Sequence, residues 1–96
     1  MNSRQRAYLR SLANDHEPIF SIGKAGVTPE LCAAVSDALE KRELIKISVQ
    51  KNCPESVRDY CDMLAGRTGA EPVTVVGRKF VIYRRSKEKP VIELPR

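Results

Sequence analysis

The apolar residues of this chain follow two different periods, and these periods divide the sequence into helices and strands. Apolar side chains recur at helical spacing in three segments, namely residues 3 to about 14, about 29 to 41, and 54 to the glycines at 66 and 69. Four shorter segments have strand character, namely residues 19–22, 44–50, 72–76 and 80–85. The predicted order is therefore helix, strand, helix, strand, helix, strand, strand.

Each predicted helix has a recognisable start and one apolar face. Ser3 is expected to cap the first helix, because its oxygen can accept a free amide of the first turn. Thr28 followed by Pro29 predicts the start of the second helix, and Pro54 suits the first position of the third. The residues expected to face the core are Tyr8, Leu9, Leu12 and Ala13, then Leu31, Ala34, Val35, Ala38 and Leu39, then Val57, Tyr60, Cys61 and Leu64.

The strand patterns predict one mixed sheet in a single domain covering residues 1–96. From 44 to 50, apolar and polar residues alternate, which is typical of a strand with one buried face. Strand-helix-strand steps favour parallel strands, and the closing hairpin adds an antiparallel one. We therefore expect an α/β fold, an N-terminal helix followed by β-α-β-α-β-β, with a four-stranded mixed sheet. Apolar residues at 91, 92 and 94 predict that the tail partly folds back on the body.

A glycine-flanked loop stands between the first strand and the second helix. Gly23, Lys24, Ala25 and Gly26 lie between a strand end and a helix N-terminus, where unpaired amides carry partial positive charge. The two glycines let a phosphate oxygen approach the backbone, and Lys24 adds a full charge. The spacing alone is equally compatible with an ordinary turn, and the nearby Glu30 would compete for the same amides.

The net charge of the chain indicates which kind of partner it could bind. The chain has 17 Lys and Arg residues against 12 Asp and Glu, a net charge of +5, which favours a polyanionic partner. Residues 70–96 carry most of the excess. With two Phe, three Tyr and no Trp, an aromatic stacking platform is not expected, so binding should be mainly electrostatic.

The sequence contains no pattern that favours catalysis, metal binding or a membrane. Cys32, Cys53 and Cys61 form no paired motif, and His16 is far from them, so we expect no metal, disulfide or cofactor. No Ser or Cys stands at an evident nucleophile position with a base in reach. No apolar run approaches membrane-spanning length and no signal segment is visible, so a cytoplasmic location is expected.

Several separated segments together resemble a known family. They are Ile22-Gly23-Lys24-x-Gly26-Val27-Thr28, Glu43-Leu44-Ile45-Lys46, the ending from Val76 to Arg84, and Leu94-Pro95-Arg96. In this order they resemble the CRM domain, named for chloroplast RNA splicing and ribosome maturation, and more closely its stand-alone bacterial YhbY type. The resemblance covers nearly the whole chain. One departure is Arg85, where a small residue or proline is expected in relatives.

The resemblance implies a function as well as a fold. It implies a fold similar to that of the C-terminal domain of translation initiation factor three. It also implies that the protein binds RNA, has no enzymatic activity and is associated with precursors of the large ribosomal subunit. The RNA-binding loop of the family corresponds to Gly23, Lys24, Ala25 and Gly26, beside Thr28. The basic residues expected to contact flanking phosphates are Arg4, Arg10, Lys46, Arg84 and Arg85.

Two alternatives stay open at this point. A protein-docking module could use the same basic face to bind ribosomal proteins or an assembly GTPase. Tyr83 could stack on a base or pack inward, because it lies on one of two faces of an alternating strand. We expect the protein to act as a monomer.

Overall fold

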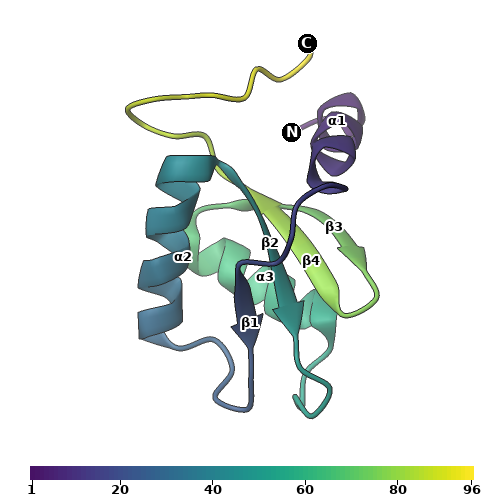
Figure 1. Ribbon diagram of the computed structural model, residues 1–96, viewed down its shortest axis with the longest axis vertical. Helices are drawn as coiled ribbons and strands as arrows, with labels where there is room; N and C mark the ends of the chain where they lie inside the picture. Colours follow the sequence, from purple (N-terminus) through teal and green to yellow (C-terminus); the bar gives the residue numbers. More distant parts are fainter.

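The computed structural model describes all residues, 1–96, and contains the seven predicted elements in the predicted order. The elements are α1 (Ser3–Ala13), β1 (Phe20–Ile22), α2 (Pro29–Arg42), β2 (Leu44–Val49), α3 (Val57–Thr68), β3 (Glu71–Val76) and β4 (Lys79–Tyr83). Figure 1 shows the four strands as one twisted sheet, with the two chain ends at the same end of the molecule.

The sheet is mixed and its strand order is β1-β2-β4-β3. The pair β1 and β2 is parallel, whereas β4 is antiparallel to both of its neighbours, β2 and β3. The crossover through α3 thus places β3 in the same direction as β2 but one strand away, and β4 fills the gap between them. The predicted four-stranded mixed α/β fold is confirmed, and the insertion of β4 is a detail that the pattern did not predict.

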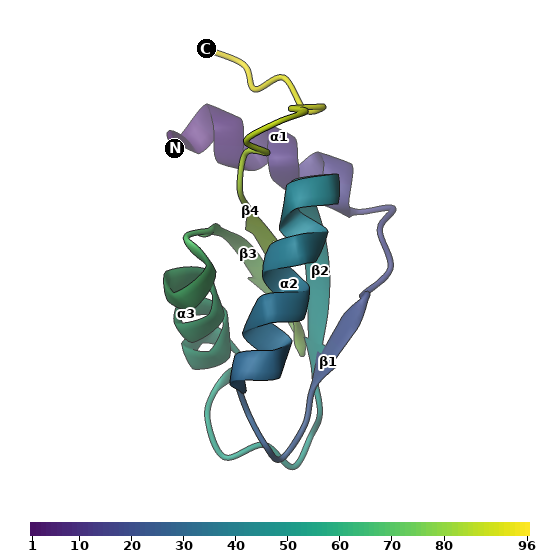
Figure 2. The ribbon, with the colours of Figure 1, turned by 90° about the vertical axis from the view of Figure 1, so that its left-hand side faces the viewer.

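The sheet has two apolar faces of unequal size. On one face, α2 and α3 lie side by side (Figure 2) and enclose a cluster of 12 buried residues that includes Val35, Ile47 and Phe80. On the other face, α1 lies across one end and covers a cluster of 6 buried residues that includes Leu9, Leu44 and Tyr83. Because α1 is short, it leaves the remainder of this second face without a helix.

The helix starts follow side-chain oxygens more closely than proline. Thr28 caps α2, as predicted, but α1 is capped by Asn2 instead of Ser3, through a reciprocal pair of hydrogen bonds with Gln5. The predicted start of the third helix at Pro54 is wrong: Ser56 accepts the Asp59 amide at 3.0 Å, and α3 begins at Val57. The serine oxygen accepts a hydrogen bond from a free amide of the first turn, whereas a proline only has no N–H of its own and gives the other free amides no acceptor.

Two residues expected in the core lie at its rim. Ala34 is exposed and Tyr8 is 39% exposed. In α2 the buried arc centres on Val35 and extends toward Cys32, which packs against the main cluster, so Ala34 turns outward. Gly66 lies inside α3, and Gly69 alone, at φ 74°, ends it.

The C-terminal tail is attached to the body by two carboxylates. The Glu43 side chain is fully buried and accepts the amides of Ser86, Val91 and Ile92 at 2.7–2.8 Å. Glu40 accepts the Ser86 hydroxyl at 2.6 Å. Ile92 and Leu94 pack against the cluster under α1, so the predicted fold-back is confirmed for these two residues.

Candidate functional site

The loop between β1 and α2 is a tight turn with two exposed residues at its tip. The Gly26 amide donates to the Gly23 carbonyl at 3.0 Å, and Gly26 has φ of 71°, a conformation that side chains disfavour. The two middle residues, Lys24 and Ala25, are exposed, and their amides make no hydrogen bond within the protein. The loop therefore offers two free donors at its tip, while the amide of Gly26 is already used.

The helix that follows adds one free amide. Thr28 Oγ1 accepts the Leu31 amide at 3.1 Å, so the threonine oxygen serves as the helix cap. The exposed Glu30 has a backbone amide without an acceptor, as expected in a first turn, and its carboxylate makes no ion pair. The free amide of Glu30 and the partial positive charge of the N-terminus of α2 attract an anion to the loop region, whereas the Glu30 carboxylate opposes it.

The inner side of the loop is held by α3 and the segment before it. The Cys53 thiol donates to the Gly23 carbonyl at 3.3 Å, and Arg67 Nη1 donates to the Val27 carbonyl at 3.1 Å. A Cβ on Gly26 would lie 3.8 Å from the Tyr60 ring. The loop is thus held by contacts to Gly23, Gly26 and Val27, and the exposed residues Lys24 and Ala25 are free to meet another molecule.

The structure places the predicted flanking cations in different surroundings. Arg10 and Lys46 come together on the second face of the sheet, where both line one hollow. Arg4, in the first turn of α1, and Arg85, after β4, are exposed. These four side chains and Lys24 make no ion pair or hydrogen bond with the protein.

Arg84 is used inside the protein. Its guanidinium donates to the Ser36 carbonyl at 2.8 Å and to the Thr68 carbonyl at 2.7 Å. These bonds tie the end of β4 to α2 and α3 on the helical side of the sheet. Arg84 is therefore not available to a phosphate in this conformation.

Tyr83 also faces inward. It is 5% exposed and belongs to the cluster under α1. Burial, reinforced by the Glu43 carboxylate, raises the pKa of its hydroxyl above the ordinary value. Of the two readings of Tyr83, packing is the one that its burial supports, and its ring has no open face for a base.

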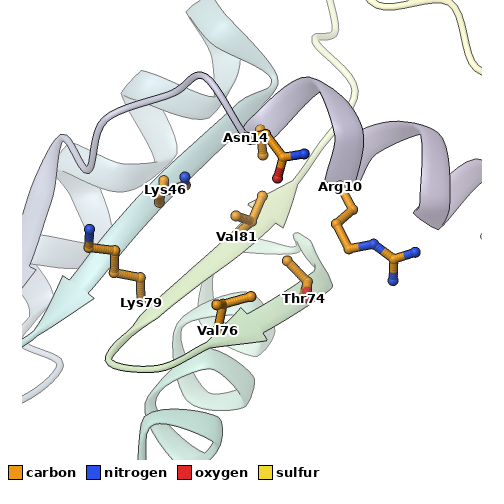
Figure 3. A pocket seen from close by; sticks show the side chains of 8 residues that line it. Arg10, Asn14, Lys46, Thr74, Val76, Lys79 and Val81 are labelled. Carbon is orange, nitrogen blue, oxygen red and sulfur yellow. The ribbon is translucent and has the colours of Figure 1, made fainter.

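The hollow beside α1 has a volume of about 260 Å³ and lies on the uncovered part of the sheet. Figure 3 shows Val81 at its centre, with Lys46 and Lys79 to one side, Asn14 above and Arg10 to the other. The lining contains no carboxylate. The place of Lys79 beside Lys46 does not follow from the sequence pattern, because it depends on how β4 pairs with β2.

Comparison with known proteins identifies the family. The model of the CRS1/YhbY (CRM) domain matches residues 1–84 of the chain. The chain belongs to this family. The expected resemblance to a CRM domain is thereby confirmed.

Relatives of similar length match over almost the whole chain. One, from Bacillus subtilis (strain 168), is named "Probable RNA-binding protein YqeI" and is 40% identical, covering 99% of both chains. Another, from Haemophilus influenzae, is named "RNA-binding protein" and is 31% identical, covering 100% of this chain and 96% of its own. The solution structure of SAV1595 from Staphylococcus aureus matches this CRM domain with a TM-score of 0.83, at 43% identity and 99% coverage of both chains.

The helices of this CRM domain are short or polar. None of them combines the length and the apolar character needed to cross a membrane.

Proposed function

We propose that this CRM domain binds RNA as a non-catalytic module, with the loop at residues 23–26 as its primary contact. The observation that carries the proposal is the pair of backbone amides at the exposed residues Lys24 and Ala25, which make no hydrogen bond within the protein, on a turn held by Cys53 and followed by the Arg67 bond to Val27. Membership of the family and the names of the two relatives favour RNA over other polyanions.

In this proposal, a phosphate of the RNA backbone accepts the amides of Lys24 and Ala25, and the ammonium of Lys24 adds a salt-sensitive contact. Thr28 acts indirectly, by capping the helix whose N-terminus lies beside the phosphate. The unpaired cations Arg4, Arg10, Lys46 and Arg85 supply further phosphate contacts as the RNA extends over the surface. Arg84 is left out, because its two Nη groups already donate to Ser36 and Thr68 and its Nε is buried.

The resemblance to stand-alone bacterial YhbY proteins gives this proposal a cellular context. We propose that the RNA is a precursor of the large ribosomal subunit, bound in the cytoplasm by a monomer during assembly. The protein-docking alternative uses the same cations to bind acidic surfaces of ribosomal proteins or of an assembly GTPase. It differs in one respect, since it predicts no RNA affinity that depends on the loop.

The test is the salt dependence of RNA binding by the wild type and by Lys24→Glu. If about five phosphates are neutralised, the logarithm of the affinity should fall against the logarithm of salt concentration with a slope of about −4. Lys24→Glu should weaken binding and flatten this slope. Lys87→Glu, an equal charge change at an exposed tail residue, serves as the control.

A complementary experiment identifies the RNA in the cell. Crosslinking in cell extract, followed by sequencing of the attached RNA, should enrich large-subunit ribosomal precursor with wild type and lose it with Lys24→Glu. Equal recovery from both proteins would move the contact away from the loop. A flat salt response, with a protein partner lost in Lys24→Glu, would favour the docking alternative.

A further inference from the structure

The second sheet face carries, beside α1, a row of side chains fixed by strand register. Lys46 of β2 pairs with Val81 of β4, and Val81 pairs with Thr74 of β3, so these three side chains lie on one face. The next pair along the hairpin, Val76 and Lys79, lies on the same face two residues away. This row forms the floor and one wall of the hollow beside α1.

The charge of the hollow is entirely positive. Its lining contains three cations, Arg10, Lys46 and Lys79, and no carboxylate. None of the three makes an ion pair or a hydrogen bond with the protein. By contrast, the guanidinium groups of Arg67, Arg78 and Arg84 donate hydrogen bonds to backbone carbonyls. Three uncompensated cations around one hollow fit a polyanion.

The floor between the cations is apolar and small. Val81 lies at the bottom of the hollow and is only 3% exposed, so the apolar surface that remains open to solvent is mainly that of Val76, which is 67% exposed. The volume of about 260 Å³ lies just below the roughly 300 Å³ at which pockets for drug-sized ligands begin, so it suits one ring system. Asn14 and Thr74 add neutral donors and acceptors at the rim.

We propose that this hollow binds one unpaired nucleotide of the RNA strand, as a second site separate from the loop at 23–26. The base would lie mainly against Val76, above the buried Val81, with Asn14 able to meet its polar edge, and the adjoining phosphates would contact Arg10, Lys46 and Lys79. A base inside a duplex is stacked on both faces and paired at its edge, so only an unpaired base can enter. The inference rests on the proposed RNA binding and adds that the protein selects RNA with single-stranded nucleotides.

The experiment compares two RNA probes of the same sequence. One is a short blunt duplex, and the other is that duplex with a short single-stranded extension. The wild type should bind the extended probe about tenfold more tightly, the order expected for one seated base and its phosphates. The double variant Lys46→Gln/Lys79→Gln, and separately Val76→Ser, should bind the two probes with nearly equal affinity.

Two controls separate this site from the loop. Lys41→Gln/Lys87→Gln removes the same charge from exposed positions outside the hollow and should keep the preference of the wild type. Lys24→Glu should weaken binding of both probes by the same factor and leave their ratio unchanged. In addition, 4-thiouridine placed in the extension should crosslink to the segment of residues 74–81, which forms the floor of the hollow.

The outcomes of the two proposals are distinct. Equal binding of the two probes by the wild type, or a preference that persists in the hollow variants, would overturn the nucleotide site while Lys24→Glu still reports on the loop. Crosslinks confined to residues 23–31 would overturn it as well. Failure of the wild type to bind either probe would overturn the proposed function and this inference together.

Discussion

Replacing Glu43 with glutamine should release part of the C-terminal tail and lower the free energy of unfolding. The Glu43 carboxylate is buried, and its two oxygens divide three amides: Oε2 accepts that of Ser86, and Oε1 accepts those of Val91 and Ile92. A glutamine has one acceptor oxygen and one NH2 group. Whichever way the glutamine amide is oriented, its NH2 group replaces one of the carboxylate oxygens, so at least one backbone N–H faces a donor and loses its acceptor.

The cost can be assembled from these contacts. A buried donor left without an acceptor costs about 1–3 kcal/mol, and each bond that changes from a charged to a neutral acceptor weakens by about 1 kcal/mol. The tail is only partly buried, so its amides can turn toward water and recover some of this loss. We therefore expect Glu43→Gln to lower the free energy of unfolding by about 2–3 kcal/mol.

The same carboxylate makes stability depend on pH. Burial pushes the pKa of Glu43 upward, but the three amides and Arg85 together outweigh burial and hold the pKa below its ordinary value of 4.5. A group whose pKa is lower in the folded than in the unfolded chain stabilises the fold above the unfolded value. Its contribution is lost as the pH falls below about 4.5 and through the folded pKa.

Urea denaturation of the full chain, at neutral pH and in steps below pH 4.5, measures both effects. Glu93→Gln, at an exposed tail residue without a hydrogen bond, is the matched control and should leave the midpoint almost unchanged. Hydrogen exchange should quicken at the amides of 86, 91 and 92 in Glu43→Gln alone. Equal midpoints for the two variants, or an unchanged acid dependence in Glu43→Gln, would refute this account of the tail.

Three further measurements address other parts of the molecule. Gly26→Ala should lower the free energy of unfolding by about 1 kcal/mol because φ is positive there, although the nearest atom to the new Cβ is 3.8 Å away; urea denaturation measures it. Gly66→Ala, inside α3 with nothing within 4 Å, should raise it by roughly 0.5–1 kcal/mol in the same assay, and a loss would contradict the open surroundings. Burial raises the pKa of Cys61 to about 11, so a thiol reagent should modify Cys32 and Cys53 in the native protein and Cys61 only after unfolding; rapid modification of all three would be inconsistent with that burial.

Local signals predicted the elements, because each depends on residues near one another in sequence. Thr28 and Pro29 define a helix start without help from the rest of the chain. The start of α3 was misplaced because Pro54 and Ser56 are two residues apart and both are start signals, and the hydrogen bond from Asp59 decides between them. Such a choice depends on coordinates that periodicity does not contain.

The interior position of β4 is related to a feature other than apolar-polar alternation, namely apolar residues on both faces of the strand. Residues 80–83 are buried at four successive positions, whereas β3 has exposed or half-buried residues at five of its six positions. A strand that is apolar on both faces belongs inside a sheet that is covered on both sides. This pattern indicates an interior strand, and the pairing shows that its neighbours are β2 and β3.

In the candidate site too, features that depend on neighbouring residues could be predicted, and features that depend on distant segments could not. The loop at 23–26 could be located from its own residues, since glycines, a strand end and a helix cap are adjacent there. The occupation of Arg84 by Ser36 and the meeting of Lys46 with Lys79 join segments more than 30 residues apart, so neither follows from sequence spacing. The sequence shows which residues are basic, but it does not show which side chains surround each of them in the fold.

The position of β4 has a consequence for synthesis. The strand that joins the two halves of the sheet is the last one to leave the ribosome, so a nascent chain that ends before residue 83 has unpaired edges on both β2 and β3. Cooperative folding must then wait for nearly the full polypeptide, and stalled or truncated products will present two adhesive edges at once.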